Sequence, residues 1–448
     1  MTQSLNDLTQ ALLAAARAAG ADAADAVAVD GTSLSIEVRG GALEQAERSE
    51  GIDIGLRVMI GQRQANVSSS DTRPETLATM AERAVAMANE APEDPYLGLA
   101  DASQLAQNWD IGALELADPA AEPAPADLES DAREVESLTL AHDGITQIQS
   151  AAAAYSNTNI HIATSNGFSG GYTRTSRSLY CVAIAGTGSN MERDHDGDSR
   201  IFQSDLRSAR DIADQTAQRT LDRMGARKPP TGTYPVLFDE RISSSLIGHL
   251  LGAINGSAIA RGASFLRDSL GQQVLPTTLS VLENPHRPRA VGSRAFDAEG
   301  LPTAPRAIID NGTLTGWTLD LATARQLDMT PTANAARGTS SPPSPATWNI
   351  ALTQSDQSRA DLIADMGTGL LVTSLIGATI NPNTGEYSRG AAGFWIENGE
   401  ITHAVNECTI AGNLRDMLLR LNPANDARAH LSSVVPSILI EGMILAGE

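Results

Sequence analysis

Two turn-forming segments near the C-terminal end constrain the fold more than any other part of the chain. Residues 381–385 (NPNTG) cannot continue a helix or a central strand, because proline lacks a backbone donor and glycine tolerates positive φ angles. Further on, Asn398-Gly399 separates two strand-like runs, residues 394–397 and 400–405. Asn-Gly is typical of the type I′ turn, whose twist matches that of paired strands. We therefore predict a β-hairpin centred on Asn398-Gly399.

A two-residue turn also sets the register of this hairpin. Ile396 would face Ile401, and Phe394 would face His403. These four residues and Val405 would then share one face. A histidine among apolar neighbours is more often structural than catalytic. A second Asn-Gly pair at residues 311–312 predicts another hairpin of the same kind.

The length of 448 residues exceeds what one hydrophobic core usually holds, so we expect more than one domain. Changes in composition divide the chain into four parts. An N-terminal α+β domain covers residues 1–90, a linker rich in proline, alanine and acidic residues covers 91–127, a middle domain covers 128–228, and a C-terminal domain covers 231–448. The expected fold class is α+β, with an N-terminal α/β-hairpin domain, a middle α+β segment, and a large, sheet-rich and mostly antiparallel C-terminal domain.

The charge and the cysteine content exclude several classes of protein. The formal net charge is −22, which would repel the phosphates of nucleic acids, so we expect no direct nucleic-acid binding. No run of 18 apolar residues exists, so we expect no membrane partner. Cys181 and Cys408 are far apart in sequence, which indicates a reducing, cytoplasmic compartment. Residues 1–20 lack a basic segment before their apolar residues, and we predict a helix that begins at Ser4 rather than a signal peptide.

Several short patterns resemble sites but lack essential residues. Residues 194–198 (DHDGD) resemble the start of a calcium loop, yet its sixth position is Ser199 and its twelfth is Asp205. We predict a solvated loop there. His403 and Cys408 lie on one predicted strand, which gives them no reason to form a thiol–imidazole pair, and Cys408 should be a buried small hydrophobe.

The densest motif lies in residues 377–401, GATINPNTGEYSRGAAGFWIENGEI, followed by TIAGNL at residues 409–414. This stretch resembles the end of the TldD/PmbA family, and within it the PmbA (TldE) branch. The resemblance implies a subunit of a TldD/TldE-type metalloprotease. Members of the family act on unfolded peptides, including peptide antibiotic precursors and antitoxins. An older family name, modulator of DNA gyrase, implies a link to gyrase.

The catalytic TldD branch carries an HExxxH zinc motif on the helix that corresponds to our predicted helix Ser243–Asn255. Aligned through residues 261–265 (RGASF), the motif falls on residues 247–252, where Ile247, Gly248 and Gly252 occupy the places of the two histidines and the glutamate. None of these side chains can bind zinc or activate water. The resemblance therefore implies no catalytic or metal residue in this chain, and zinc in a partner subunit. His249 lies off the apolar stripe of this helix and should be solvated or hydrogen-bonded.

The resemblance also implies partners and a channel for substrate. A zinc-bearing TldD-like subunit would form a heterodimer with this chain, and a homodimer could form in isolation. Our candidates for lining the peptide channel are Asn381, Thr384, Ser388 and Arg389. Two alternatives stay open. The chain could be a stand-alone hydrolase with an unrecognised active site, or a non-proteolytic binding protein that modulates DNA gyrase. Ser388 and Arg389 could be proposed as a nucleophile and its oxyanion partner, but in a glycine-rich turn such residues more often hold backbone geometry.

Overall fold

The structure, a computed structural model, describes residues 4–448. The first helix, α1 (Leu5–Ala18), begins where the sequence predicts. The Ser4 hydroxyl accepts a hydrogen bond from the Asp7 backbone, and the Asp7 carboxylate accepts one from the Ser4 backbone. This capping box satisfies two free N–H groups of the first turn, and Gly20, at a φ of 100°, follows the end of the helix. Residues 1–3 of the predicted N-terminal segment lie outside the described range.

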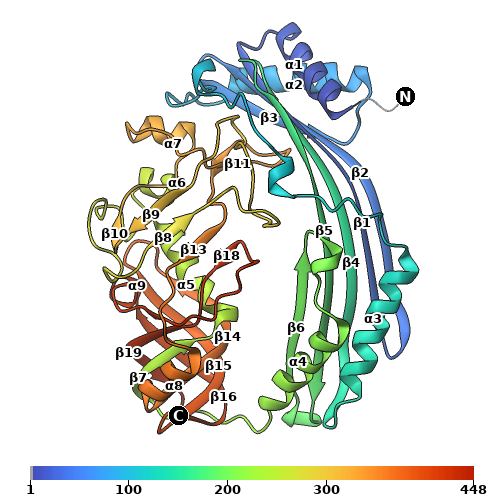
Figure 1. Cartoon of the computed structure of the whole chain (residues 1–448). Helices are drawn as coiled ribbons and strands as arrows, with labels where there is room; N and C mark the ends of the chain where they lie inside the picture. The colour runs from blue at the N-terminus through green and yellow to red at the C-terminus, as the bar shows by residue number, and fades with distance from the viewer. Residues whose placement is uncertain (1–3) are drawn as a thin grey trace.

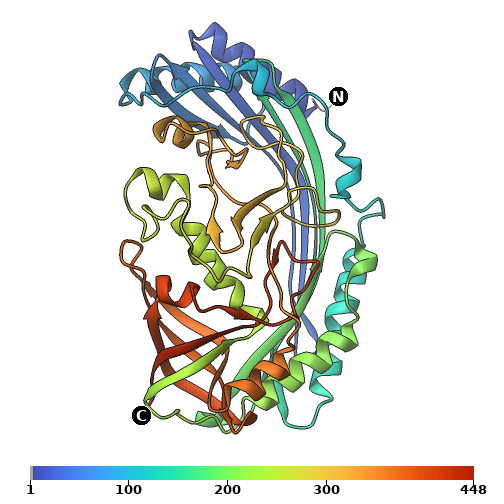
Figure 2. The ribbon, with the colours of Figure 1, turned by 60° about the vertical axis from the view of Figure 1, so that its left-hand side comes forward.

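One long antiparallel sheet joins the N-terminal and middle parts of the chain. Its strand order is β3-β2-β1-β4-β5-β6. The strands are β1 (Ala23–Arg39), β2 (Ala42–Ile60), β3 (Arg63–Ser69), β4 (Ile145–Thr164), β5 (Ser169–Ala185) and β6 (Glu192–Arg200). Pairing of β1 with β4 makes the sheet continuous. The sheet is strongly curved, and the C-terminal part of the chain lies against its concave side (Figures 1 and 2).

Two pairs of helices cover the convex side of the sheet. At one end, α1 and α2 (Pro74–Glu90) pack on the first three strands. At the other end, α3 (Pro125–Leu140) and α4 (Ala209–Asp222) pack on β1, β4 and β5. Side chains alternate between the faces of a strand, so Ala26 and Ala28 face the helices while Val27 faces the C-terminal part. Residues 145–164 form one continuous strand, β4, which spans the length of the sheet.

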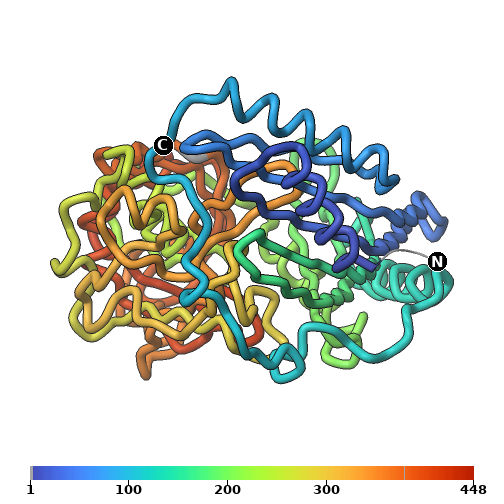
Figure 3. Tube along the Cα trace, turned by 90° about the horizontal axis from the view of Figure 1, so that it is seen from above, coloured from blue at the N-terminus to red at the C-terminus, as the bar shows by residue number. Residues whose placement is uncertain are grey.

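The proline-rich segment between α2 and α3 has little regular structure. It contains two short 3₁₀ turns, Ala102–Gln104 and Gly112–Leu114. Leu114 and Leu116 are buried together with Ile201, so parts of the segment pack on the protein. Seen from above, the segment crosses from the N-terminal end of the sheet along the boundary with the C-terminal part (Figure 3).

The C-terminal part is built around a second six-stranded sheet, in the order β16-β15-β14-β7-β19-β17. Its strands are β7 (Gly232–Phe238), β14 (Gly369–Ile380), β15 (Glu386–Glu397), β16 (Glu400–Asn413), β17 (Asn422–Pro423) and β19 (Ile438–Ala446). Because β16 also pairs with β19, five of these strands close into a barrel. Most neighbours are antiparallel, as predicted, and the pair β14–β7 is parallel.

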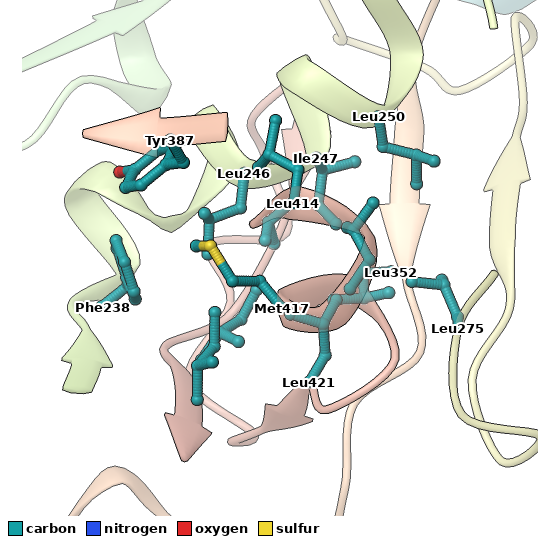
Figure 4. Close-up of a cluster of buried hydrophobic side chains, with 14 of the residues drawn as sticks. Phe238, Leu246, Ile247, Leu250, Leu275, Leu352, Tyr387, Leu414, Met417 and Leu421 are labelled. Carbon is teal, nitrogen blue, oxygen red and sulfur yellow. The ribbon is translucent and has the colours of Figure 1, made fainter. Parts of the chain in front are cut away.

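Helix α5 (Glu240–Ala253) supplies the main apolar surface of this part. It begins three residues before the predicted start, because Asp239 caps it by accepting a hydrogen bond from the Arg241 backbone at 3.1 Å. Leu246, Ile247 and Leu250 are 0–1% exposed. They pack in one cluster with residues of α9 (Leu414–Leu418) and neighbouring strands (Figure 4).

A smaller sheet and short helices complete the C-terminal part. The sheet has the order β10-β9-β8-β13-β18, and a separate ribbon pairs β11 with β12. These strands are β8 (Val281–Glu283), β9 (Arg306–Asp310), β10 (Thr313–Leu314), β11 (Ala335–Ala336), β12 (Ser344–Pro345), β13 (Ile350–Leu352) and β18 (Ser433–Val434). The remaining helices are α6 (Gly256–Ala260), α7 (Leu321–Gln326) and α8 (Arg359–Met366).

Both predicted Asn-Gly hairpins are present. Asn398 and Gly399 have φ angles of 51° and 76°, as a type I′ turn requires, and Ile396 pairs with Ile401. The predicted pairing of Phe394 with His403 is wrong. A β-bulge at Thr402, whose hydroxyl donates to the Trp395 carbonyl at 3.2 Å, shifts the register by one residue.

The shift changes the faces of the hairpin. Phe394 now pairs with Ala404, and His403 pairs with Trp395. His403 is half-buried and Ile401 is 51% exposed, so the five residues do not share one buried face. A bulge places two residues of one strand opposite one of the other, and turn residues alone do not signal it.

Candidate functional site

A cavity of about 1030 Å³ lies between the large sheet and the barrel. Strands β4, β5 and β6 form one wall, and α5, β14 and Arg389 of β15 form the other. Residues that line it include Gln149, Tyr180, Val182, Arg193, His195, Arg241, Ser244, Ser245, Thr373, Ile376 and Arg389. The two walls come from segments far apart in sequence. Because this cavity is lined by both halves of the chain, we take it as the candidate site.

The face of α5 opposite its buried stripe consists of small residues. Ser244 lines the cavity, and Gly248 and Gly252 follow it at intervals of four residues on the same helix face. Both glycines are exposed, and a Cβ atom at either would meet no atom within 4 Å. The helix therefore has open space beside the two glycines.

The residues of α5 do not fit a zinc ion. Ile247, at one of the two histidine places, is fully buried in the core, and Gly248 and Gly252 have no side-chain donors. In the part of the chain that the structure describes, no group of three or more histidine, cysteine, aspartate or glutamate side chains could hold a metal ion. At the motif places that the resemblance implies, α5 therefore has no side chain that could bind zinc.

His249 differs from the prediction of a solvated or hydrogen-bonded residue. It is half-buried, and its Nε2 is buried without a hydrogen-bond partner among residues 4–448. Its ring lies 6.0 Å from the Tyr387 ring in an edge-to-face arrangement. Burial, and then the charge of Arg389, lower the pKa of His249 below its ordinary value, so the imidazole is neutral at neutral pH. Burial also raises the pKa of Tyr387 to about 12.

The structure separates the four predicted channel residues. Asn381 and Thr384 are exposed in the turn at residues 381–385, where the Asn381 side chain accepts a hydrogen bond from the Asn383 backbone at 3.0 Å. Ser388 is half-buried in β15, paired with Thr379 and Ala411. Of the four, Arg389 lines the cavity.

Arg389 is held in place by its own strand and its neighbour. Its Nε donates to the Gly377 carbonyl of β14 at 2.7 Å. No described residue offers Ser388 an imidazole as base, because its contacts are those of a strand ladder. Contact of these residues with a peptide stays a prediction.

The predicted loop at residues 194–198 is instead part of strand β6, and the prediction of a solvated loop is wrong. Asp194 and Asp196 are only 6% and 3% exposed. Asp196 pairs with Arg207 at 2.7 Å and Arg219 at 2.6 Å on α4 and the segment before it. Buried carboxylates need such partners, and these arginines follow later in the sequence.

Asp194 connects the sheet to the helix beside the cavity. Its carboxylate lies 3.3 Å from Arg241 of α5 and 3.6 Å from Arg223. Asp194 also borders the cavity, and at alternate positions of β6 Arg193 and His195 line it as exposed side chains. The alternation of the strand thus makes Asp194 and Asp196 part of a buried ion-pair network and leaves Arg193 and His195 exposed.

Sequence reasoning missed a buried group of charges at the junction of the sheet with the C-terminal part. Asp25 of β1 lies between Arg57 of β2 and Arg337, and all three side chains are at most 5% exposed. Nearby, burial raises the pKa of Glu299 to about 8, with Asp297 as the next cause, and burial also raises the pKa of Asp297. Only the acidic pair in residues 296–300 (FDAEG) could have signalled this cluster, and it does not show burial.

The cysteines are free and buried, as predicted for Cys408. Its sulfur donates to the Ala391 carbonyl at 3.2 Å, and burial raises its pKa to about 11. A thiol of this kind is protonated at neutral pH and is a poor nucleophile. His403 instead contacts the Thr402 hydroxyl at 3.0 Å. Among the described helices, none is long and apolar enough to cross a membrane.

Family models match most of the chain. The PmbA/TldA metallopeptidase domain 1 matches residues 24–88, the central domain matches residues 118–224, and the C-terminal domain matches residues 231–447. Together the matches include both walls of the cavity and helix α5.

Individual proteins give the same result. The chain is 35% identical over 429 residues to metalloprotease PmbA of Escherichia coli O157:H7, covering 95% of this chain and 93% of that one. It is 34% identical to the metalloprotease PmbA homolog of Haemophilus influenzae, covering 96% and 93%. A crystal structure from Bacteroides thetaiotaomicron, provisionally described as a modulator of DNA gyrase, superposes over both full chains with a TM-score of 0.92 and 26% identity. TldE from Thermococcus kodakarensis, at 20% identity and a TM-score of 0.86, shares the fold over 98% of this chain and 100% of that one. The chain belongs to the PmbA/TldD metallopeptidase family.

Proposed function

We propose that this chain is the non-catalytic subunit of a TldD/TldE-type metalloprotease. It pairs as a heterodimer with a zinc-bearing TldD-like chain and helps to enclose unfolded peptides, such as peptide antibiotic precursors or antitoxins. The observation that carries the proposal is the composition of α5 beside the cavity. Ile247 is buried in the core, and Gly248 and Gly252 have no side-chain donors, although the surrounding fold is that of a metallopeptidase family.

The cavity supports a role in holding peptide. Its volume of about 1030 Å³ and its mixed polar and apolar walls suit an extended chain of several residues. One wall contains residues 373–376 of β14, which lie beyond its pairing with β7, and extended peptides bind proteins by adding as a strand to such an unpaired segment. Two free, buried cysteines agree with a cytoplasmic location for this chain.

Co-expression with a TldD-like chain tests the proposal. We expect the two chains to co-purify, and cleavage of an unfolded peptide to need both. A chelator, or Glu→Gln at the partner's motif glutamate, should abolish cleavage. The matched control in this chain is His249→Ala. His249 does not occupy one of the motif places and is not expected to bind zinc, so this substitution should leave cleavage by the pair unchanged within about twofold.

Three results would contradict the proposal. A sister chain that cuts equally well alone would remove the need for this subunit. Cleavage by this chain alone in excess chelator would favour the stand-alone hydrolase. Binding of gyrase without any cleavage, even beside the sister chain, would favour the non-proteolytic alternative, for which the description of the Bacteroides structure is the reason.

A further inference from the structure

The charge of the cavity is opposite to the charge of the molecule. The whole chain has 54 acidic against 32 basic residues. The cavity lining has four arginines and two carboxylates, namely Arg193, Arg223, Arg241, Arg389, Glu192 and Asp194. In so acidic a chain, a lining set by composition alone would contain more carboxylates than arginines. The excess of arginine in this cavity is therefore opposite in sign to the net charge of the chain.

Two of the four arginines are already neutralised. Arg223 lies 3.5 Å from Glu192, and Arg241 lies 3.3 Å from Asp194. Arg193 and Arg389 have no carboxylate partner within residues 4–448. Arg193 donates to the Gln149 side chain at 3.2 Å, and Arg389 donates to the Gly377 carbonyl. A guanidinium has five N–H donors, so both retain donors for a ligand.

The wall between these arginines includes an unpaired stretch of strand. β14 pairs with β15 along most of its length, but with β7 only from Leu370 to Val372. Beyond Val372, in the described part of the chain, no strand lies on that side of β14. Residues 373–376 there line the cavity. Thr373 is 6% exposed, and its hydroxyl has no hydrogen-bond partner among the described residues. The unpaired edge can therefore accept a further strand.

We propose that an extended peptide binds along residues 373–376 of β14, and that Arg193 and Arg389 bind a carboxylate of that peptide. The inference rests on the proposed role in holding unfolded peptides and names the chemistry of the preferred substrate. Arg193 comes from β6 and Arg389 from β15, so the carboxylate lies between the two walls. Guanidinium groups bind carboxylates with two parallel hydrogen bonds, which gives both affinity and orientation.

Apolar side chains beside the arginines set a second requirement. Ile376 is 70% exposed and Tyr180 is 39% exposed, and both line the cavity. An apolar residue of the peptide would cover Ile376, which otherwise contacts water. The preferred peptide thus combines an acidic group with an apolar residue. The carboxylate can belong to a side chain or to the C-terminus, and these two sources share the same chemistry.

A binding experiment distinguishes a side-chain carboxylate from a C-terminal one. It measures the affinity of the full-length chain for four short, unstructured peptides labelled with fluorescein. The peptides contain leucine and either glutamate or glutamine, each with a free or an amidated C-terminus, and fluorescence anisotropy measures their affinity. We expect the peptide with glutamine and an amide to bind roughly tenfold more weakly than a peptide with the preferred carboxylate. Raising the salt concentration should reduce the difference.

Substitutions assign the effect to the two arginines. Arg193→Gln and Arg389→Gln should each weaken carboxylate binding roughly tenfold and leave the neutral peptide unchanged, and Arg389→Lys should restore part of the affinity. Arg193 is exposed, so Arg193→Gln keeps the test valid if Arg389→Gln fails to fold. The matched control is Arg83→Gln on α2. Arg83 is exposed and forms no ion pair within residues 4–448, so this substitution should leave the affinity for all four peptides unchanged.

The outcomes separate this inference from the proposed function. Equal affinity for all four peptides, or equal loss for charged and neutral peptides in Arg193→Gln, would overturn the carboxylate site and leave peptide binding intact. No binding of any peptide would overturn both. If the glutamate peptides bind more tightly than the glutamine peptides even when amidated, the bound carboxylate belongs to the side chain. If amidation weakens the binding of the glutamate and glutamine peptides alike, the bound carboxylate is the C-terminus.

Discussion

Arg241 in the first turn of α5 lies 3.3 Å from Asp194 of β6, so one ion pair connects the helix of the cavity to the opposite sheet. Both side chains are at most 15% exposed. The same carboxylate forms a second ion pair with Arg223. Asp239, the cap of α5, forms ion pairs with Arg241 and Arg359. The width of the cavity therefore depends on a buried network as well as on apolar packing.

The neighbouring carboxylate gives the first prediction. Asp196→Ala should lower the free energy of unfolding by on the order of 3 kcal/mol, because it leaves Arg207 and Arg219 without their buried partner. Urea denaturation measures the change. Asp268→Ala, which removes an 85% exposed partner of Arg267, is the control and should cost less than about 0.5 kcal/mol. Equal effects of the two substitutions would contradict a buried network.

The hairpin turn gives the second prediction. Gly399→Val should cost about 1–3 kcal/mol, because a β-branched residue is strained at a φ of 76°. A Cβ atom there would also lie 2.9 Å from the Ala364 carbonyl oxygen. The control is Gly51→Val in strand β2, where no atom lies within 4 Å and the φ is not positive. Chemical denaturation should show no loss for this control, and an unchanged midpoint for Gly399→Val would show that the turn tolerates a side chain.

The third prediction concerns pH. The folded state raises the pKa of Glu299 to about 8, so the folded chain binds more protons than the unfolded chain between the ordinary glutamate pKa and that value. The contribution of Glu299 to the free energy of unfolding is therefore fully present below the ordinary glutamate pKa, and it is lost as the pH rises through about 8. Glu299→Gln should therefore flatten the decline in denaturation midpoint over this range. A decline that is identical in the variant would assign it to another group.

Metal content gives the fourth prediction. Protein purified without an affinity tag should contain no stoichiometric zinc, since Ile247, Gly248 and Gly252 have no ligand atoms at the motif places. Elemental analysis measures this directly. The controls are His249→Ala on α5 and His430→Ala in the segment between β17 and β18, and neither should change the metal content. About one zinc per chain that is lost in either variant would refute the prediction.

Much of the local structure could be predicted from the sequence. The capping box at Ser4 and the two Asn-Gly turns are present because capping and positive φ angles depend on neighbouring residues. The buried stripe of α5 was also predictable from its helical spacing. Its start was not, because Asp239 was not recognised as the cap.

The errors share one cause. Residues 194–198 resemble a polar loop, but arginines from α4 and α5 satisfy their carboxylates, and these partners come from distant parts of the chain. The bulge at Thr402 likewise depends on how β16 fits its neighbours rather than on the turn. Of the four predicted channel residues, Arg389 lines the cavity, and no local pattern distinguishes it from Asn381 or Thr384.

Local sequence is sufficient to predict the turns, the helix cap, the α+β class and the lack of zinc-binding side chains at positions 247, 248 and 252. These properties depend on backbone sterics, hydrogen bonds within a few residues and the chemistry of single side chains. Contacts between distant segments, in contrast, make one sheet join the first and middle parts, close the barrel by pairing β16 with β19, and bring Arg193 and Arg389 to one cavity. Such placements depend on long-range strand pairing and on the burial of charges by residues far apart in the chain, and no short segment contains that information.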